Sequence, residues 1–156
     1  MSADSASGDE QPTTESATGQ LGANIRATLL ADGEELFGLI TVRKKSRIPG
    51  LSGFYSGLIE IQPEPEPLPN AMTMAAAVTS RRVLVVEISG PLTNVTEAKR
   101  IVAEMALSEV QSIELDEGMN MWRVHWDCGG YHYTVASTAG RAGPFAKTLK
   151  AAASHA

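Results

Sequence analysis

The chain has 156 residues and a mass of 16.5 kDa, the size of one ordinary domain with a short extension. Hydrophobic residues make up 43% and charged residues 20%, which excludes a collagen, a disulfide-stapled miniprotein and a chain disordered throughout. The net charge is -5, but residues 1–20 carry four acidic and no basic residues. The remainder is nearly neutral, so it offers no overall attraction to nucleic acid or to an anionic membrane.

Cys128 is the only cysteine, which excludes an intramolecular disulfide and a cysteine-rich zinc site. The N-terminus has neither the basic start nor the apolar run of a signal peptide. The longest apolar runs, 74–78 and 83–86, are far too short to cross a membrane. These features predict a cytoplasmic location, with a virus particle or a host-cell interior as the alternative.

Residues 1–20 consist mainly of Ser, Thr, Ala, Gly and acidic side chains. Such a segment buries too little apolar surface to offset its ordering entropy, so we predict a disordered tail. Residues 21–156 are predicted to form a single α+β domain. We expect a mostly antiparallel sheet of about six to eight strands, one central helix and a short C-terminal helix.

A β-meander is predicted over residues 24–62. In 25–31 apolar and polar residues alternate, as in a strand with one buried face. An Asp-Gly pair at 32–33 favours a tight hairpin turn into a second strand at 35–45. Residues 54–62 form the predicted third strand.

Alternating Pro and Glu residues in 63–70 predict a stiff, extended spacer. Residues 71–156 then form the second half of the domain, with the expected element order βαβββα. Strands are expected at 72–78, where a short helix is the alternative, and at 83–88, whose apolar run indicates burial on both faces.

The helix of this half is predicted over 94–107. Asn94 and Glu97 have the spacing of a capping box, and apolar residues recur on one helical face. Further strands are expected at 110–115, 121–127 and 131–137, and a C-terminal helix is expected to start at Gly143-Pro144.

Three side chains that could carry chemistry lie close together in the sequence, namely His125, Asp127 and His132. If the Gly-Gly pair at 129–130 is a two-residue turn, Asp127 lies directly across from His132. This register separates an apolar face, which includes Trp126 and Cys128, from a polar face that carries both histidines.

Three interpretations of the polar face compete. It can be a solvated or partner-facing surface, on which Asp127 and His132 form a weak cross-strand pair. It can be a metal site, because two imidazoles and a carboxylate are suitable ligands. A nucleophilic Cys–His site is the third, although this register sends the Cys128 thiol and the imidazoles to opposite faces. The sequence holds no phosphate-binding glycine loop, and no cofactor is predicted.

A basic segment is the second candidate site. It concentrates four of the 13 basic residues into five positions, namely Arg43, Lys44, Lys45 and Arg47. Such a segment can contact the phosphates of a nucleic acid or bind another acidic partner, or it can protect a strand end from aggregation.

Because no catalytic motif is evident, we predict a non-enzymatic interaction or assembly subunit, either an adaptor or a component of a larger complex or particle. Its partner is another protein chain or a second copy of itself. The predicted contact is an edge strand at 54–61, with Phe54, Leu58 and Ile61 as candidate anchors. The alternatives are nucleic-acid or acidic-partner binding through 43–47, and a small metal-binding protein or enzyme centred on His125, Asp127 and His132.

Overall fold

A computed structural model of the chain describes residues 12–44, 57–63, 73–88 and 97–156, with side chains from Gly19 onward in the first of these ranges. The described elements follow one another along the chain as α1 (Pro12–Thr28), β2 (Leu36–Lys44), β3 (Leu58–Gln62), β4 (Thr73–Thr79), β5 (Arg82–Ile88), β6 (Ala98–Ala106), the 3-10 helix η3 (Leu107–Glu109), β7 (Gln111–Asp116), β8 (Trp122–Cys128), β9 (Tyr131–Ser137) and α2 (Ala139–Ser154). No helix in the described residues is both long and apolar enough to cross a membrane.

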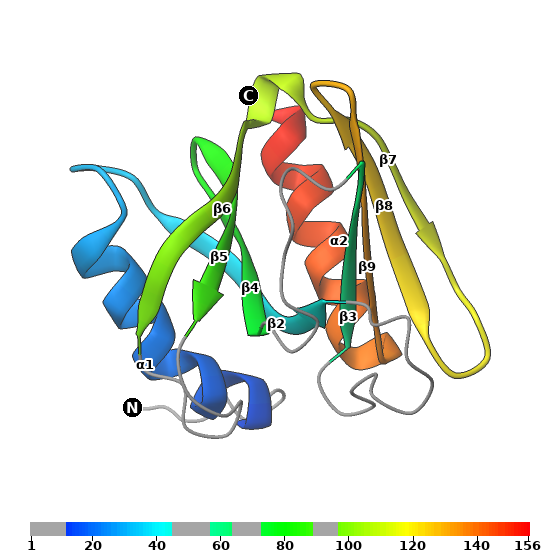
Figure 1. Cartoon of the computed structure of the whole chain (residues 1–156), viewed down its shortest axis with the longest axis horizontal. Helices are drawn as coiled ribbons and strands as arrows, with labels where there is room; N and C mark the ends of the chain where they lie inside the picture. The colour runs from blue at the N-terminus through cyan, green and yellow to red at the C-terminus, as the bar shows by residue number, and fades with distance from the viewer. Residues whose placement is uncertain (1–11, 45–56, 64–72, 89–96) are drawn as a thin grey trace.

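The eight described strands form one sheet in the order β6-β5-β4-β2-β3-β9-β8-β7. Neighbouring strands are antiparallel except β2 and β3, which are parallel and pair only through Arg43 and Lys44 of β2. This short contact joins a first half-sheet (β6-β5-β4-β2) to a second half-sheet (β3-β9-β8-β7), which lie on either side of α2 in Figure 1. The predicted α+β class with a mostly antiparallel sheet is confirmed.

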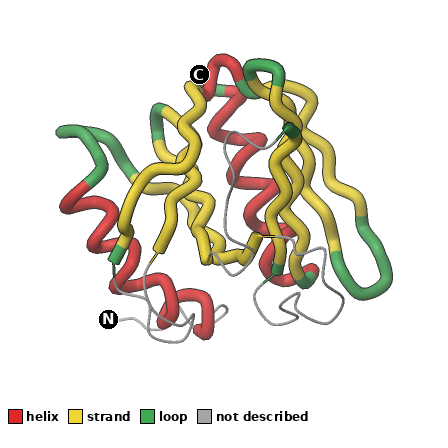
Figure 2. The backbone as a smooth tube through the Cα atoms, viewed as in Figure 1, coloured by secondary structure: helices red, strands yellow, loops and turns green. Residues whose placement is uncertain are grey.

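The larger hydrophobic core lies between α2 and both half-sheets. Phe145 and Leu149 of α2 pack there with Ile40 of the first half-sheet and with Val124 and Trp126 of the second. Trp126 of β8 donates a hydrogen bond from its Nε1 to the sulfur of Met105 in β6, at 3.2 Å, although these strands are far apart in the sheet order. The sheet therefore curls around α2, as Figure 2 shows.

A smaller core lies under α1, on the opposite side of the first half-sheet. Leu21 and Ile25 of α1 are fully buried there, against Ala75 of β4 and Leu84 and Val86 of β5. The neighbouring residues of these strands point into the larger core, because successive side chains of a strand alternate between the two faces. Burial on both faces accounts for the nearly continuous apolar sequence of β5.

The N-terminal region differs from its predicted structure. Residues 1–11 lie outside the described residues, but helix α1 begins at Pro12, inside the segment 1–20 predicted to be a disordered tail. The predicted strand at 25–31 is wrong, because most of it belongs to α1 and the rest to the turn that follows. Gly33, with a φ of 82°, is part of a turn as expected, but the turn joins a helix to β2.

The predicted meander over 24–62 is also wrong as a topology. Its second and third strands exist as β2 and β3, but they are parallel and β3 pairs along its whole length with β9. Of the predicted spacer 63–70 only Pro63 is described, so the remainder lies outside the described residues.

The predicted helix at 94–107 is the main error in the second half. Residues 98–106 form β6, an edge strand paired with β5, while 94–96 lie outside the described residues. The strands predicted at 72–78, 83–88, 110–115, 121–127 and 131–137 are confirmed to within one or two residues. The C-terminal helix is confirmed, but it begins at Ala139, and Pro144 lies inside it.

Candidate functional site

The second half-sheet has one face toward α2 and one face away from it, which we call the outer face. The inner face carries core residues such as Ile59, Val124 and Val135. The alternate residues form the outer face and are, from β3 to β7, Leu58, Glu60, Gln62, His132, Thr134, Ala136, Arg123, His125, Asp127, Gln111, Glu114 and Asp116. Both described helices lie elsewhere, since α1 packs on the first half-sheet and α2 on the inner face.

The predicted hairpin register is correct in the structure. Residue 128 pairs with 131 and residue 127 with 132, around a turn in which Gly129 and Gly130 both have positive φ. Trp126 is fully buried and Cys128 nearly so on the inner face, while His125 and His132 lie on the outer face. This placement rules out a direct Cys128–histidine pair through the sheet.

His125 lies at the centre of a hydrogen-bonded chain of three side chains. Its Nδ1 is 3.1 Å from the hydroxyl of Thr134, and its Nε2 is 2.9 Å from a carboxylate oxygen of Asp116. The His125 side chain is 21% exposed. The three residues come from neighbouring strands β9, β8 and β7, so the sheet register holds the imidazole in one orientation.

His132 and Asp127 form a second pair, with 2.7 Å between Nδ1 of the imidazole and a carboxylate oxygen. Both side chains are about half exposed, so the attraction between them is screened by water and contributes little to stability. The rings of His132 and His125 stack with their centroids 5.5 Å apart. The two histidines and two aspartates therefore form one ordered cluster.

The cluster does not have the geometry of a metal centre. Among the residues that the structure describes, no group of three or more His, Cys, Asp or Glu side chains is arranged to hold a metal ion. Both ring nitrogens of His125 already contact side chains, Asp116 and Thr134. The structure brings His125, Asp127 and His132 onto one face but not around one point.

The order carboxylate, imidazole, hydroxyl in Asp116, His125 and Thr134 is also the order of a hydrolase triad. Acyl transfer further requires amide or side-chain donors aimed at the developing oxyanion. Thr134 lies in the middle of β9, between Glu60 of β3 and His125 of β8, where the backbone amides bond within the sheet. The arrangement is better suited to presenting fixed polar groups than to stabilising an oxyanion.

The outer face is acidic. Among the described residues of β3, β9, β8 and β7, it carries the carboxylates of Glu60, Glu114, Asp116 and Asp127 and one arginine, Arg123. The Glu60 carboxylate accepts a hydrogen bond from the amide of Gln62 at 2.9 Å. Negative charge on this face favours a positively charged binding partner.

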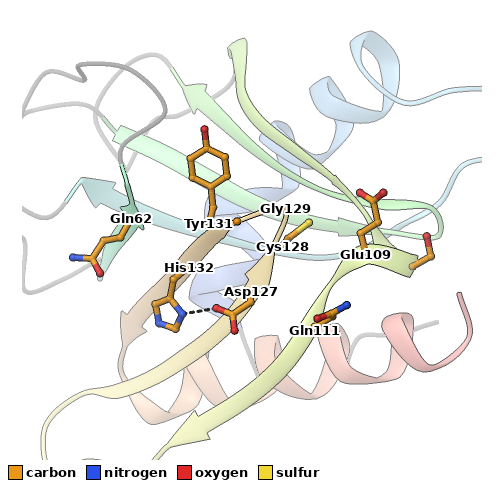
Figure 3. A pocket seen from close by; sticks show the side chains of 10 residues that line it. Gln62, Glu109, Gln111, Asp127, Cys128, Gly129, Tyr131 and His132 are labelled. Carbon is orange, nitrogen blue, oxygen red and sulfur yellow. Dashed lines mark hydrogen bonds and ion pairs between the residues drawn. The ribbon is translucent and has the colours of Figure 1, made fainter.

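A shallow, open depression of about 590 Å³ lies at the β8–β9 turn end of the outer face. Figure 3 shows its side chains, which come from β3, η3, β7, β8 and β9. They are Gln62, Ser108, Glu109, Gln111, Asp127, Cys128, Gly129, Gly130, Tyr131 and His132. The pKa of the Cys128 thiol is raised, first by burial and also by the negative charge of Glu109.

The other predicted contact residues are only partly described. Arg43 and Lys44 are half-buried at the end of β2, and Lys45, Arg47 and Phe54 lie outside the described residues. Ile61 is only 6% exposed and belongs to the larger core, so its side chain is not available as an anchor. Leu58 is half-buried and lies on the outer face.

Sequence reasoning placed Thr134 on the same face as His125 but did not identify it as a partner of the imidazole, and it missed Asp116 and the neighbouring Glu114. The contact of Thr134 with His125 could have been predicted, because the correct hairpin register places the two residues directly opposite each other. Asp116 and Glu114 depend on the pairing of β7 with β8, which has an irregularity between Gln111 and Glu114 that no local pattern indicates.

Comparison of the chain with models of known protein families gives no match, and comparison with curated protein sequences gives none either.

Proposed function

We propose that the protein is a non-enzymatic interaction or assembly subunit that binds another protein chain through its outer face. The observation that carries this proposal is that both described helices pack elsewhere, while the outer face presents side chains already held in hydrogen-bonded pairs. A surface ordered before binding loses less conformational entropy when a partner docks.

The charge of the outer face supports a partner other than the same face of a second copy. A two-fold symmetric contact would place the same patch against itself. With four carboxylates and one arginine on the patch, like charges would meet across such a contact. We therefore expect the partner to present a basic surface, either on another protein or on a different part of a second copy.

Two other predictions from the sequence remain untested, namely binding through the basic segment and a cytoplasmic location. Binding of nucleic acid or an acidic partner through Arg43, Lys44, Lys45 and Arg47 would use the end of β2 and the residues after it, of which Lys45 and Arg47 lie outside the described residues. A cytoplasmic location agrees with a free, buried Cys128, because a reducing compartment keeps a thiol in that state.

The test compares one double variant, in which charge and side-chain size on the outer face are changed, with a control substitution on α2. The variant combines Glu114→Lys with Thr134→Arg, which makes the outer face less acidic, and the control is Lys150→Glu, an exposed residue on the opposite side of the second half-sheet. Tagged wild type and variants are recovered from the native cells and bound proteins are quantified. We expect at least one protein, or a second copy of the chain, to be lost from the outer-face variant and kept by the control.

Sedimentation of the purified chains over a concentration series separates self-association from binding to another protein. Unchanged thermal midpoints would show that the variants are folded. The proposal fails if the wild type is monomeric at all concentrations and the set of bound proteins is the same for wild type and outer-face variant.

A further inference from the structure

The depression at the β8–β9 turn lies at one end of the proposed docking face and shares Gln62, Asp127 and His132 with it. None of its ten lining residues is a lysine or an arginine, while Glu109 and Asp127 supply two carboxylates. Gln62 and Gln111 add amide oxygens, and Ser108 adds a hydroxyl. The lining is therefore rich in hydrogen-bond acceptors and negative charge.

The positions of these groups are set by the fold. Asp127 lies directly across from Gln111 in the β7–β8 pairing and from His132 in the β8–β9 pairing. Its hydrogen bond to His132 orients the carboxylate through one oxygen. Glu109 lies in η3, two residues before Gln111, at the connection between the two edge strands of the sheet.

The negative charge of Glu109 also acts on the Cys128 thiol, which lines the depression from the inner-face side of the hairpin. Cys128 lines the depression, and the negative charge of Glu109 helps to raise its pKa by disfavouring a second negative charge. A cation in the same place would be favoured for the same reason.

We infer that the depression receives an arginine side chain of the partner, an inference that rests on the proposed function of the outer face. A guanidinium group carries five N–H donors in a planar fork, which suits several acceptors on a partly open surface better than a single point charge. Hydrogen bonds between such a cation and carboxylates are among the stronger ones at a protein surface.

The probe for the test is a tri-arginine peptide, and its matched control is tri-citrulline, which has nearly the same shape without the charge. Backbone amide NMR spectra of the full chain are recorded during titration with each peptide. We expect saturable shifts at residues 108–111 and 127–132 with tri-arginine, and none with tri-citrulline.

Three single variants locate the binding. Glu109→Gln and Asp127→Asn are each expected to weaken tri-arginine binding at least fivefold. Glu117→Gln removes the same charge from the exposed residue after β7, outside the depression, and should leave the affinity unchanged. The inference is overturned if the shifts do not saturate, if they spread over unrelated acidic residues, or if Glu117→Gln weakens binding as much as the other two.

These outcomes are distinguishable from failure of the proposed function. If tri-arginine does not bind but the partner is still lost from the Glu114 and Thr134 variant, the outer face remains the docking surface and only the arginine inference fails.

Discussion

Glu34 is buried at the turn between α1 and β2, where its carboxylate accepts hydrogen bonds from Arg82, Thr79 and the amide of Ala31. Burial alone would raise the pKa of Glu34, but these hydrogen bonds and the charge of Arg82 outweigh it and lower the pKa from 4.5 to about 2. Arg82 also donates to the carbonyl of Leu29, so the pair fastens the end of α1 to the β4–β5 hairpin.

The lowered pKa predicts a specific dependence of stability on pH. Since the folded-state pKa of Glu34 is below the ordinary value of 4.5, its contribution is complete above pH 4.5 and is lost as pH falls toward 2. The free energy of unfolding of the wild type should exceed that of Glu34→Gln by about 3 kcal/mol at pH 6 and by about 1 kcal/mol near pH 3. Urea denaturation at both pH values measures this difference. A difference that does not shrink in acid would contradict the proposed role of the carboxylate.

Trp126 is predicted to be the costliest single side chain to remove from the β8–β9 hairpin. It is fully buried, stacks on Tyr133 with ring centroids 5.3 Å apart, and donates its N–H to Met105. Trp126→Ala should lower the free energy of unfolding by about 3–5 kcal/mol. The control Met119→Ala removes a fully exposed apolar side chain and should change it by less than about 0.5 kcal/mol. Similar costs for the two substitutions would show that Trp126 is not in the core.

The sequence predicted the helices and strands whose pattern of apolar and polar residues fits only one type of secondary structure. Apolar and polar residues alternate in 122–128 and 131–137, and a Gly-Gly turn lies between them. Only one register then buries the face that carries Trp122 and Trp126, and this register is the one in the structure. That register correctly placed His125, Asp127 and His132 on one face. It could not show that Asp116 approaches from β7, because the partner strand is chosen by tertiary packing.

Strand β6 shows why a helical pattern can mislead. Ala98, Ile101, Val102 and Met105 have helical spacing, yet of residues 98–106 only Met105 is buried. The neighbouring strand β5 is buried on both faces, so its backbone amides and carbonyls need partners on both edges, and β6 satisfies one edge. This long-range requirement outweighs a local preference for helix.

Helix α1 shows the opposite error. The alternation of Ile25, Ala27 and Leu29 resembles a strand, but Leu21, Ile25 and Leu29 are also four residues apart, which places them on one side of a helix. Leu21, Ile25 and Leu29 all pack in the smaller core, as the helical spacing requires, while Ala27 is exposed. The parallel pairing of β2 with β3 could not be predicted, because no local feature of the sequence encodes it.

Gly19 lies inside helix α1, in the segment that the sequence predicts to be a disordered tail. Substitutions at Gly19 therefore test whether this helix is folded. A Cβ at this position would meet no atom within 4 Å. Gly19→Ala should therefore raise the free energy of unfolding by about 0.5–1 kcal/mol, and Gly19→Pro should lower it by about 3 kcal/mol. Thermal or urea denaturation tests both. If neither substitution has an effect, residue 19 is not part of a folded helix.

Helix α2 joins the two half-sheets, whose strands pair with each other at only two residue pairs among the described residues. Phe145, Leu149 and their neighbours on α2 pack with strands of both halves in one core. Neither half has another described element that could cover this face. The two half-sheets should therefore unfold together.

Leu149→Ala tests this coupling. Leu149 is fully buried, so the substitution should lower the free energy of unfolding by about 2–5 kcal/mol. The fluorescence of Trp122 and Trp126 reports on the second half-sheet, and far-ultraviolet circular dichroism reports on the whole chain. We expect the two transitions to coincide in both wild type and variant. Separate midpoints would indicate that the half-sheets unfold independently.

Binding of a partner to the outer face can be tested by site-specific photo-crosslinking in the native cells. A photoreactive amino acid is introduced at Arg123 on the outer face, or at Lys150 on the exposed side of α2. We predict a discrete crosslinked product from position 123 that is absent from position 150, and that disappears when Thr134→Arg is added. No product from position 123, or the same product from both positions, would contradict the assignment of the outer face as the docking surface.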